Sequence, residues 1–385
     1  MRVTQQMLSA NTMRYINQGY NQLGKLQDQL TTGKRITRVS QDPVIAMKGL
    51  QHRQASSEIG QFKRNISEAQ NWLDHSEGVL DQGSQILKRI SELAVQASND
   101  TYDEGQRENI AKEIGQLKQY MQDLGNSKVD NRYLFNGANT DKAPIMKDAI
   151  MEAGVGPLER GAAPEDFTIV YNGQNFRYLE GENGEFTFQD VRQFGENIDE
   201  EDRVLLTIRT TEDDGPTVTF TSPEAGGIST NVELSQVATI ENRAVSQNTQ
   251  DVTIEVNKGI KIPVNVQGSD LFSASLFGDI TRLEAALKDP NTTGSDLSGY
   301  ITDIDNHHAT FVSERSEVGV RLNRIDMMVT RLEDQDVNLK KMMTNNEDVD
   351  IEETIMNLVM AENVNRVALA SGARIMQPSL MDFLR

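Results

Sequence analysis

The chain has 385 residues, which is enough for two or three domains, and its 58 acidic and 38 basic residues give a formal net charge of −20. This balance argues against nucleic acid and against an anionic membrane as partners, because both are bound through clustered Lys and Arg side chains. No cysteine is present, which excludes disulfides and thiolate metal sites. No apolar run approaches the roughly 20 residues of a membrane-spanning helix, and the N-terminus is too polar for a cleaved signal peptide.

The acidity is concentrated in the middle of the chain. Residues 141–294 carry 27 acidic and 12 basic side chains, whereas the remaining residues carry 31 and 26. The hydrophobic pattern changes at the same two borders, from helical spacing to strand-like alternation and back again. These coincident changes predict an inserted domain between two helical ends.

The N-terminal segment is predicted to form an amphipathic helix, because its apolar residues follow heptad spacing. The residues of this stripe are Met13, Ile16, Tyr20, Leu23 and Leu30. Gly33 is expected to end the helix in the left-handed conformation, and Asp42 is expected to cap the next helix ahead of Pro43.

A much longer helix is predicted from Pro43 to Ser98. Its apolar stripe keeps steps of three and four residues without a break, which is the pattern of coiled-coil packing, and its length would be about 80 Å. We expect Asn99 and Asp100 to end it, and Thr101 with Glu104 to form a capping box for a third helix. The core residues expected on these two helices are Phe62, Ile66, Leu73, Leu80, Leu87, Ile90, Ile114 and Leu117.

Strands are predicted through the middle of the chain. Residues 132–137 form a strand pattern that ends at an Asn-Gly turn, and residues 167–171 and 176–179 form a hairpin pattern across Asn172 and Gly173. Further strands are expected at 204–210, 217–221, 252–256 and 260–266, with one short helix near 279–288. The pattern does not identify the fold of this insert.

Helical spacing returns near the C-terminus. A stripe from Ile301 to Met343 predicts a second long helix, which Asn345 and Asn346 are expected to interrupt. Its expected core residues are Phe311, Val318, Leu322, Ile325 and Leu332. A last helix is predicted to begin near Asp350, and its apolar residues are Ile351, Ile355, Leu358, Val359, Val364 and Val367.

These patterns predict a mainly α protein with a β-rich insertion. A narrow apolar stripe cannot be buried by its own helix, so both chain ends are expected to form one elongated antiparallel coiled-coil rod with an outer β domain at the turn-around. The expected divisions are a rod of residues 43–140 plus 295–345, an acidic outer insertion of residues 141–294, and a terminal assembly domain of residues 1–42 plus 346–385. Two terminal helices bury little surface alone. We therefore expect them to be disordered in the isolated monomer, with their apolar stripes as the assembly interface.

The sequence carries no motif that indicates an enzyme or a cofactor site. Thr32, Gly33 and Lys34 resemble part of a phosphate loop, but the glycine that this loop needs five positions earlier is replaced by Asp28. Asp74, His75 and Glu77 are more simply a solvated helix face than a metal site. No catalytic, cofactor-binding or metal-binding residue is therefore predicted.

Both ends of the chain contain segments that resemble the bacterial flagellin family. At the N-terminal end they are Leu30 to Ile36 (LTTGKRI), Ser40 to Val44 and Ile90 to Ser98. At the C-terminal end they are Ala361 to Val364, Ala368 to Gln377 and Ser379 to Leu384. The start Met1 to Met7, the segment Asn131 to Gly137 and the LMDFL ending resemble the subfamily of hook–filament junction proteins more than filament subunits.

The resemblance implies a structural axial protein of the bacterial flagellum, located outside the cell and exported through the flagellar type III channel without a cleaved signal peptide. It implies a ring of copies of the chain, with hook-associated protein 1 on the hook side, flagellin on the filament side, and an export chaperone before assembly. Two alternatives remain open. The chain could be the filament flagellin itself, or the insert could carry a secreted enzyme or a carbohydrate-binding module.

Overall fold

The structure is a computed structural model that describes residues 5–99, 103–182, 184–194, 199, 202–210, 215–223 and 229–376. Its contacts divide the chain into two compact units. Unit 1 comprises Met1–Arg64 and Val329–Arg385, and unit 2 comprises Asn65–Met328. Both borders fall inside long helices, so they do not coincide with the borders expected from sequence. The predicted segments at Met1 to Met7 and Ser379 to Leu384 lie partly or wholly outside the described residues.

The predicted class, mainly α with an antiparallel β-rich insert, is confirmed. The helices are α1 (Gln5–Thr32), α2 (Pro43–Ala97), α3 (Glu104–Gly125), α4 (Gly156–Glu159), α5 (Gly268–Leu271), α6 (Ala274–Lys288), α7 (Leu297–Glu347) and α8 (Ile351–Met376). The strands are β1 (Lys128–Val129), β2 (Arg132–Tyr133), β3 (Met151–Ala153), β4 (Phe167–Tyr171), β5 (Gln174–Glu182), β6 (Glu185–Asp190), β7 (Leu205–Arg209), β8 (Thr217–Thr221), β9 (Ser229–Val232), β10 (Ala238–Glu241), β11 (Thr253–Asn257) and β12 (Ile260–Pro263).

The ends of the helices follow the expected caps in part. Gly33 has φ +66° directly after α1, and the Asp42 carboxylate accepts hydrogen bonds from the amides of the first turn of α2. The capping box predicted from Thr101 and Glu104 is wrong, because α3 is capped by Asp103, which exchanges hydrogen bonds with Gln106. Thr101 itself lies outside the described residues.

The interruption expected at Asn345 and Asn346 is also wrong, because α7 continues to Glu347. Asparagine disfavours helix interiors when its side chain competes for nearby backbone groups. Here the Asn346 amide instead donates to the carbonyl oxygen of Ile45 on α2, at 3.0 Å. A partner distant in sequence has therefore removed the local reason for the helix to stop.

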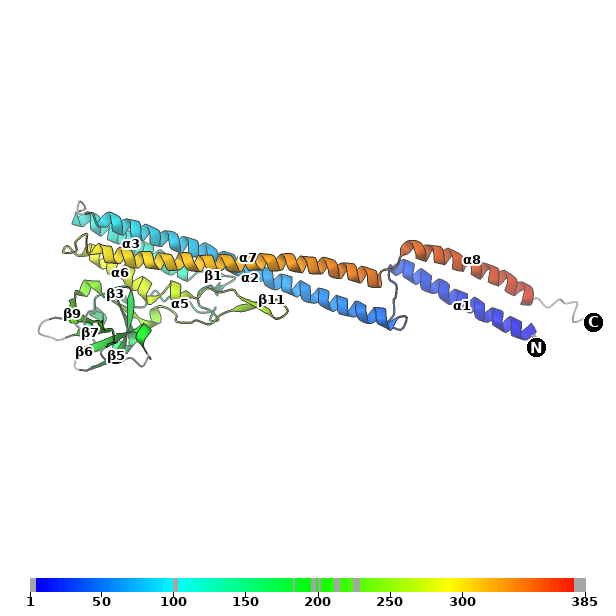
Figure 1. Cartoon of the computed structure of the whole chain (residues 1–385), viewed down its shortest axis with the longest axis horizontal. Coiled ribbons are helices and arrows are strands. Elements are labelled where there is room, and N and C mark those ends of the chain that lie inside the picture. Colours follow the sequence, from blue (N-terminus) through cyan, green and yellow to red (C-terminus); the bar gives the residue numbers. More distant parts are fainter. Residues whose placement is uncertain are drawn as a thin grey trace, which may run out of the picture. The chain divides into compact units, whose positions relative to one another are not determined.

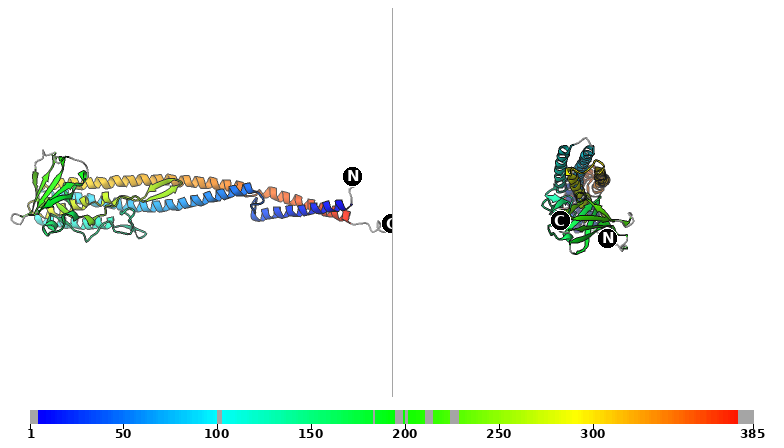
Figure 2. Two further views of the ribbon diagram at one scale, coloured as in Figure 1. Left: turned by 90° about the horizontal axis from the view of Figure 1, so that it is seen from below. Right: turned by 90° about the vertical axis from the view of Figure 1, so that its left-hand side faces the viewer.

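In unit 2, α2 and α7 run antiparallel and side by side, as both Figure 1 and Figure 2 show. Polar pairs along them fix the direction, since Gln70 bonds Asp326 while Ser91 bonds Asp305. The seam between the helices is close-packed at Gly83, where an added Cβ would lie 2.5 Å from Cε1 of Phe311. Glycine is thus required there because an aromatic ring occupies the space beside the helix.

The insert is built around one eight-stranded sheet in which all neighbours are antiparallel. Its strand order is β3-β10-β4-β5-β6-β7-β8-β9. The predicted hairpin is confirmed at β4 and β5, whose turn residues Asn172 and Gly173 have φ of 49° and 69°. The strand expected at 132–137 is limited to β2, because the next residues turn inward and bury Phe135 against Phe272.

The two faces of this sheet are covered differently. One face carries an apolar cluster built from alternate strand residues, including Phe176, Phe188 and Leu206. The other face receives α6, which approaches so closely at Gly278 that an added Cβ would lie 2.6 Å from the Val170 side chain. Helix α6 also packs on α3, where Lys118 and Glu284 form an ion pair at 2.9 Å. The insert therefore shares its packing with the helices of unit 2.

Candidate assembly surface on the terminal helices

In unit 1, α1 and α8 lie side by side (Figure 1). Their contact depends on small residues: a Cβ on Gly19 would lie 3.3 Å from Oδ1 of Asn365, and one on Gly372 would lie 3.2 Å from the Thr12 methyl group. Among the described side chains of these two helices, Ile16 is the one large apolar residue that is buried. The two helices therefore contact each other over a narrow interface and do not enclose a hydrophobic core.

Most of the residues predicted as the assembly interface lie on the solvent side of this pair. On α1, Leu23 and Leu30 are half-buried, whereas Met13 and Tyr20 are exposed. On α8, Leu358 is half-buried, and the exposed members are Ile351, Ile355, Val359, Val364 and Val367. Val364 and Val367 expose 63% and 65% of their surface, so their own chain does not bury them.

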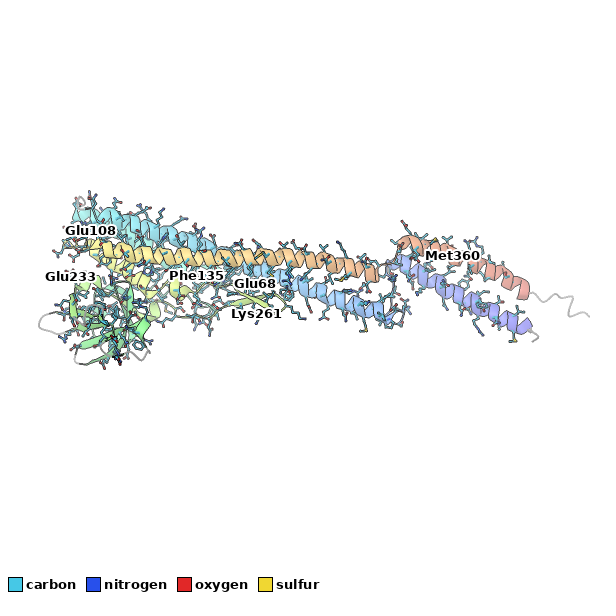
Figure 3. The ribbon with its side chains drawn as sticks, viewed as in Figure 1. Glu68, Glu108, Phe135, Glu233, Lys261 and Met360 are labelled. Atoms are coloured by element: carbon cyan, nitrogen blue, oxygen red, sulfur yellow. The ribbon has the colours of Figure 1, made fainter. Side chains whose placement is uncertain are left out.

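Further exposed apolar residues join this surface, and the sequence reasoning missed them. They are Met7, Leu8 and Tyr15 on α1, with Met356, Met360 and Leu369 on α8. Met360 is labelled in Figure 3. The available signal was that Met356, Met360 and Leu369 add large apolar residues to α8 beyond the predicted stripe.

A short backbone bridge joins the segments that follow α1 and precede α8. The Arg35 amide donates to the carbonyl oxygen of Glu347 at 2.6 Å, and the Val349 amide donates to that of Gly33 at 3.0 Å. The Lys34 ammonium adds a salt bridge to Asp348 at 2.8 Å. We call these contacts the clasp, and they tie the entry and exit of the terminal helix pair to each other.

Glu347 is the buried charge of the clasp, and Arg53 and Lys34 neutralise it. Its Oε2 lies 2.7 Å from Nη2 of Arg53 and 3.3 Å from Nζ of Lys34. The hydrogen bond from Arg53 holds the pKa of the Glu347 carboxyl below its usual value, although desolvation opposes this shift. The other oxygen, Oε1, rests against the backbone of α2 at Gly49, where any Cβ would collide with it.

The predicted rod residues lie in both units and face inward. Ten of them are buried: Ile66, Leu73, Leu80, Leu87, Ile90, Ile114, Phe311, Val318, Ile325 and Leu332. The other three, Phe62, Leu117 and Leu322, are half-buried. Arg315 sits at the edge of the α2–α7 seam and pairs with Glu77 and Asp81 at 2.7 and 2.6 Å, so polar contacts flank the apolar stripe.

Among the described residues, no group of three or more His, Asp and Glu side chains is placed to hold a metal ion. No helix in the described part of the chain is long and apolar enough to cross a membrane. His308 on α7 forms a 2.9 Å hydrogen bond to Ser84 on α2.

Two family models match the chain at its two ends. The bacterial flagellin N-terminal helical region matches residues 3–140, and the bacterial flagellin C-terminal helical region matches residues 301–384. Together they cover more than half of the sequence and contain α1, α2, α3 and α8. The chain belongs to the bacterial flagellin family.

Among its relatives, the chain is similar to flagellar hook-associated protein 3 of Salmonella typhimurium, at 30% identity over 146 residues. That match covers 38% of this chain and 46% of the relative, so the chain spans about half the length of this relative. It is also similar to a flagellin of Clostridium tyrobutyricum, at 22% identity over 91% of this chain and 92% of the relative. A solved structure of a hook-associated protein from Vibrio parahaemolyticus shares the fold, with a TM-score of 0.52 and 16% identity over 80% of this chain and 100% of the other.

Proposed function

We propose that this chain is a structural subunit of the bacterial flagellum that forms the junction between hook and filament. The observation that carries the proposal is the exposed apolar surface of α1 and α8, in a chain of the flagellin family. Burying that surface would stabilise an assembly, and association would supply the free energy needed to order two thin helices. The similarity to hook-associated protein 3 supports the junction position. No catalytic step is part of this proposal.

Under this proposal the partners are copies of the chain in a ring, hook-associated protein 1 on the hook side and flagellin on the filament side. Residues 1–42 plus 346–385 form the assembly domain, residues 43–140 plus 295–345 the rod, and residues 141–294 the outward insertion. The apolar face of α8 also suits an export chaperone, because an amphipathic helix in a groove needs one apolar face. Chaperone binding and assembly should therefore exclude each other.

The test uses a flagellated strain that lacks its junction protein. Without the chain, flagellin should be exported into the medium and fail to form filaments, and the wild-type gene should restore them. The double variant Val359→Asp/Val364→Asp should be exported and fail to restore filaments. Glu352→Asp/Glu362→Asp is the matched control, because it alters exposed acidic positions on the same helix. If the Val359→Asp/Val364→Asp variant restores filaments, the assignment of this face of α8 to assembly is wrong.

The filament flagellin is the second candidate, and the match to the Clostridium tyrobutyricum flagellin over most of both chains favours it. The two candidates differ in self-assembly. A filament subunit elongates purified filament seeds into long filaments by itself, whereas a junction protein adds a limited layer and stops. Electron microscopy of seeds incubated with the purified chain would distinguish them.

A further inference from the structure

A cluster of buried charged side chains lies where the β4–β5 turn meets α6 and α7 in unit 2. Asp279 and Arg282 on α6 form an ion pair at 2.6 Å, and both side chains are at most 5% exposed. From α7, Nε2 of His307 lies 2.8 Å from the Asp279 carboxylate. The second carboxylate, Asp303 on α7, lies 3.6 Å from Nη1 of Arg282.

The cluster is not internally balanced. Two carboxylates face one guanidinium, and His307 adds a positive charge only when it is protonated. Within the described residues, Oδ2 of Asp303 has no hydrogen-bond partner, and the 3.6 Å contact with Arg282 is its one compensating charge from a guanidinium. The Arg282 guanidinium also lies 5.0 Å from the ring centre of Tyr300 and 5.8 Å from that of Tyr171, and among the described residues its Nε has no hydrogen-bond partner.

The turn between β4 and β5 rests directly on this cluster. The Gly173 carbonyl oxygen accepts a hydrogen bond from the Ser275 hydroxyl at 3.2 Å, and Ser275 also lies 3.3 Å from the Asp279 carboxylate. A Cβ on Gly173 would lie 3.0 Å from Oδ1 of Asp303. Because β4 and β5 are central strands of the sheet, this contact is where the charged cluster meets the middle of the insert.

We propose that Asp303 is a proton-operated latch that sets how firmly the β4–β5 turn is held against α6 and α7. When its carboxyl is neutral, Asp279 is the one carboxylate of the cluster and is paired with Arg282 and His307, so the turn docks without an unpaired buried carboxylate. When the carboxyl ionises, the excess negative charge is relieved by opening the contact to water. The groups that face Asp303 are Asp279 and Arg282 from α6, His307 and Tyr300 from α7, and Tyr171 from β4.

The direction of the pH effect follows from the environment of Asp303. Burial raises its pKa to about 6, and the Asp279 carboxylate acts in the same direction, while Arg282 and His307 oppose the shift. A carboxyl whose pKa is raised in the docked state stabilises that state below its ordinary pKa near 3.8. This contribution is lost as the pH rises towards and through about 6. The latch is therefore tight in mild acid and looser at neutral pH.

The test is hydrogen exchange by mass spectrometry on the full chain, corrected for intrinsic exchange rates, at pH 5.0 and 7.5. In the wild type, the opening constant of residues 168–178 should increase about tenfold between these values. Asp303→Asn, which keeps the shape and removes the charge, should show no such increase. Asp305→Asn changes an exposed carboxylate on the same helix and should behave like the wild type.

An opening constant that is flat in the wild type, or that rises equally in Asp303→Asn, would overturn the latch. If Asp303→Asn does not fold, the carbon-13 signals of the aspartate carboxyls in the unmodified protein provide the second measurement. A buried carboxyl that titrates near pH 6 supports the latch. Titration of every aspartate near its ordinary value would overturn it.

Discussion

The α2–α7 seam of unit 2 and the α1–α8 pair of unit 1 both carry apolar residues at helical positions, but these residues are buried in the seam and mostly exposed on the pair. In unit 2, Leu73, Leu80 and Leu87 are fully buried, whereas on α8 Val359 and Val364 expose more than half of their surface. The seam has further elements, including α3 and α6, that complete a core around it. Apolar residues at helical spacing therefore identify a surface that needs a partner, and the number of neighbouring elements decides whether the same chain supplies that partner.

The largest expected effect on the free energy of unfolding comes from a charge placed in the α2–α7 seam of unit 2. Leu87→Asp places an ionised carboxylate at a fully buried position, which costs several kcal/mol because the charge has no partner there. Asn71→Asp introduces the same side chain at an exposed position of α2 and should change the stability by about 0.5 kcal/mol at most. Thermal unfolding followed by circular dichroism compares the two. Equal unfolding temperatures for the two variants would contradict the assignment of Leu87 to the buried seam and of Asn71 to the surface.

Two glycines of α2 provide a smaller and sharper test of the same seam. Gly83→Ala pushes a methyl group into the Phe311 ring and should destabilise unit 2 by about 1–3 kcal/mol. Gly78→Ala meets no atom within 4 Å and should stabilise the helix by up to about 1 kcal/mol. Chemical denaturation should therefore give shifts of opposite sign, and shifts of the same sign would contradict the packing described for Phe311.

The clasp should contribute less, because Arg53 and Lys34 are both substantially exposed. Glu347→Gln should cost about 1 kcal/mol, measured as faster hydrogen exchange at residues 33–35 and 347–349. Because the pKa of Glu347 is lowered in the folded chain, its contribution is present at neutral pH and is lost as the pH falls through that lowered pKa. The wild type and Glu347→Gln should therefore converge in acid. A stability difference between the two proteins that persists in acid would show that Glu347 acts through packing and not through its charge.

The smallest effect on the monomer is expected on the exposed face of α8. Val364→Asp should leave the thermal midpoint of the isolated chain almost unchanged, because the side chain already contacts mostly water. The same change should abolish any concentration-dependent association seen by analytical ultracentrifugation. If the monomer instead unfolds, the chain itself buries this face, and the contrast between the two helix pairs fails.

The long helices were predictable because their apolar stripes extend over many turns, and the β4–β5 hairpin because Asn172 and Gly173 encode its turn. β3 and β10 were missed, since each is short and they pair across a long sequence separation, for example Ala238 with Ala153. β6 and β9 were also missed, although each pairs with the strand that precedes it in the sequence. The clasp was missed for the same reason as β3 and β10: Lys34 and Asp348 pair across 314 positions. The charged cluster was not predicted either, because the helical spacing of Asp279 and Arg282 does not show that the β4–β5 turn and α7 pack against them.

We expect the seam of unit 2 to close within one chain and the terminal helices to bury their apolar residues only in an assembly. Hydrogen exchange of the isolated monomer by mass spectrometry tests it most directly. Residues 66–97 of α2 and 300–325 of α7 should be strongly protected, whereas residues 7–30 of α1 and 351–373 of α8 should exchange close to the rate of an unfolded chain. Protection of the terminal helices in the monomer equal to that of the seam would contradict the account.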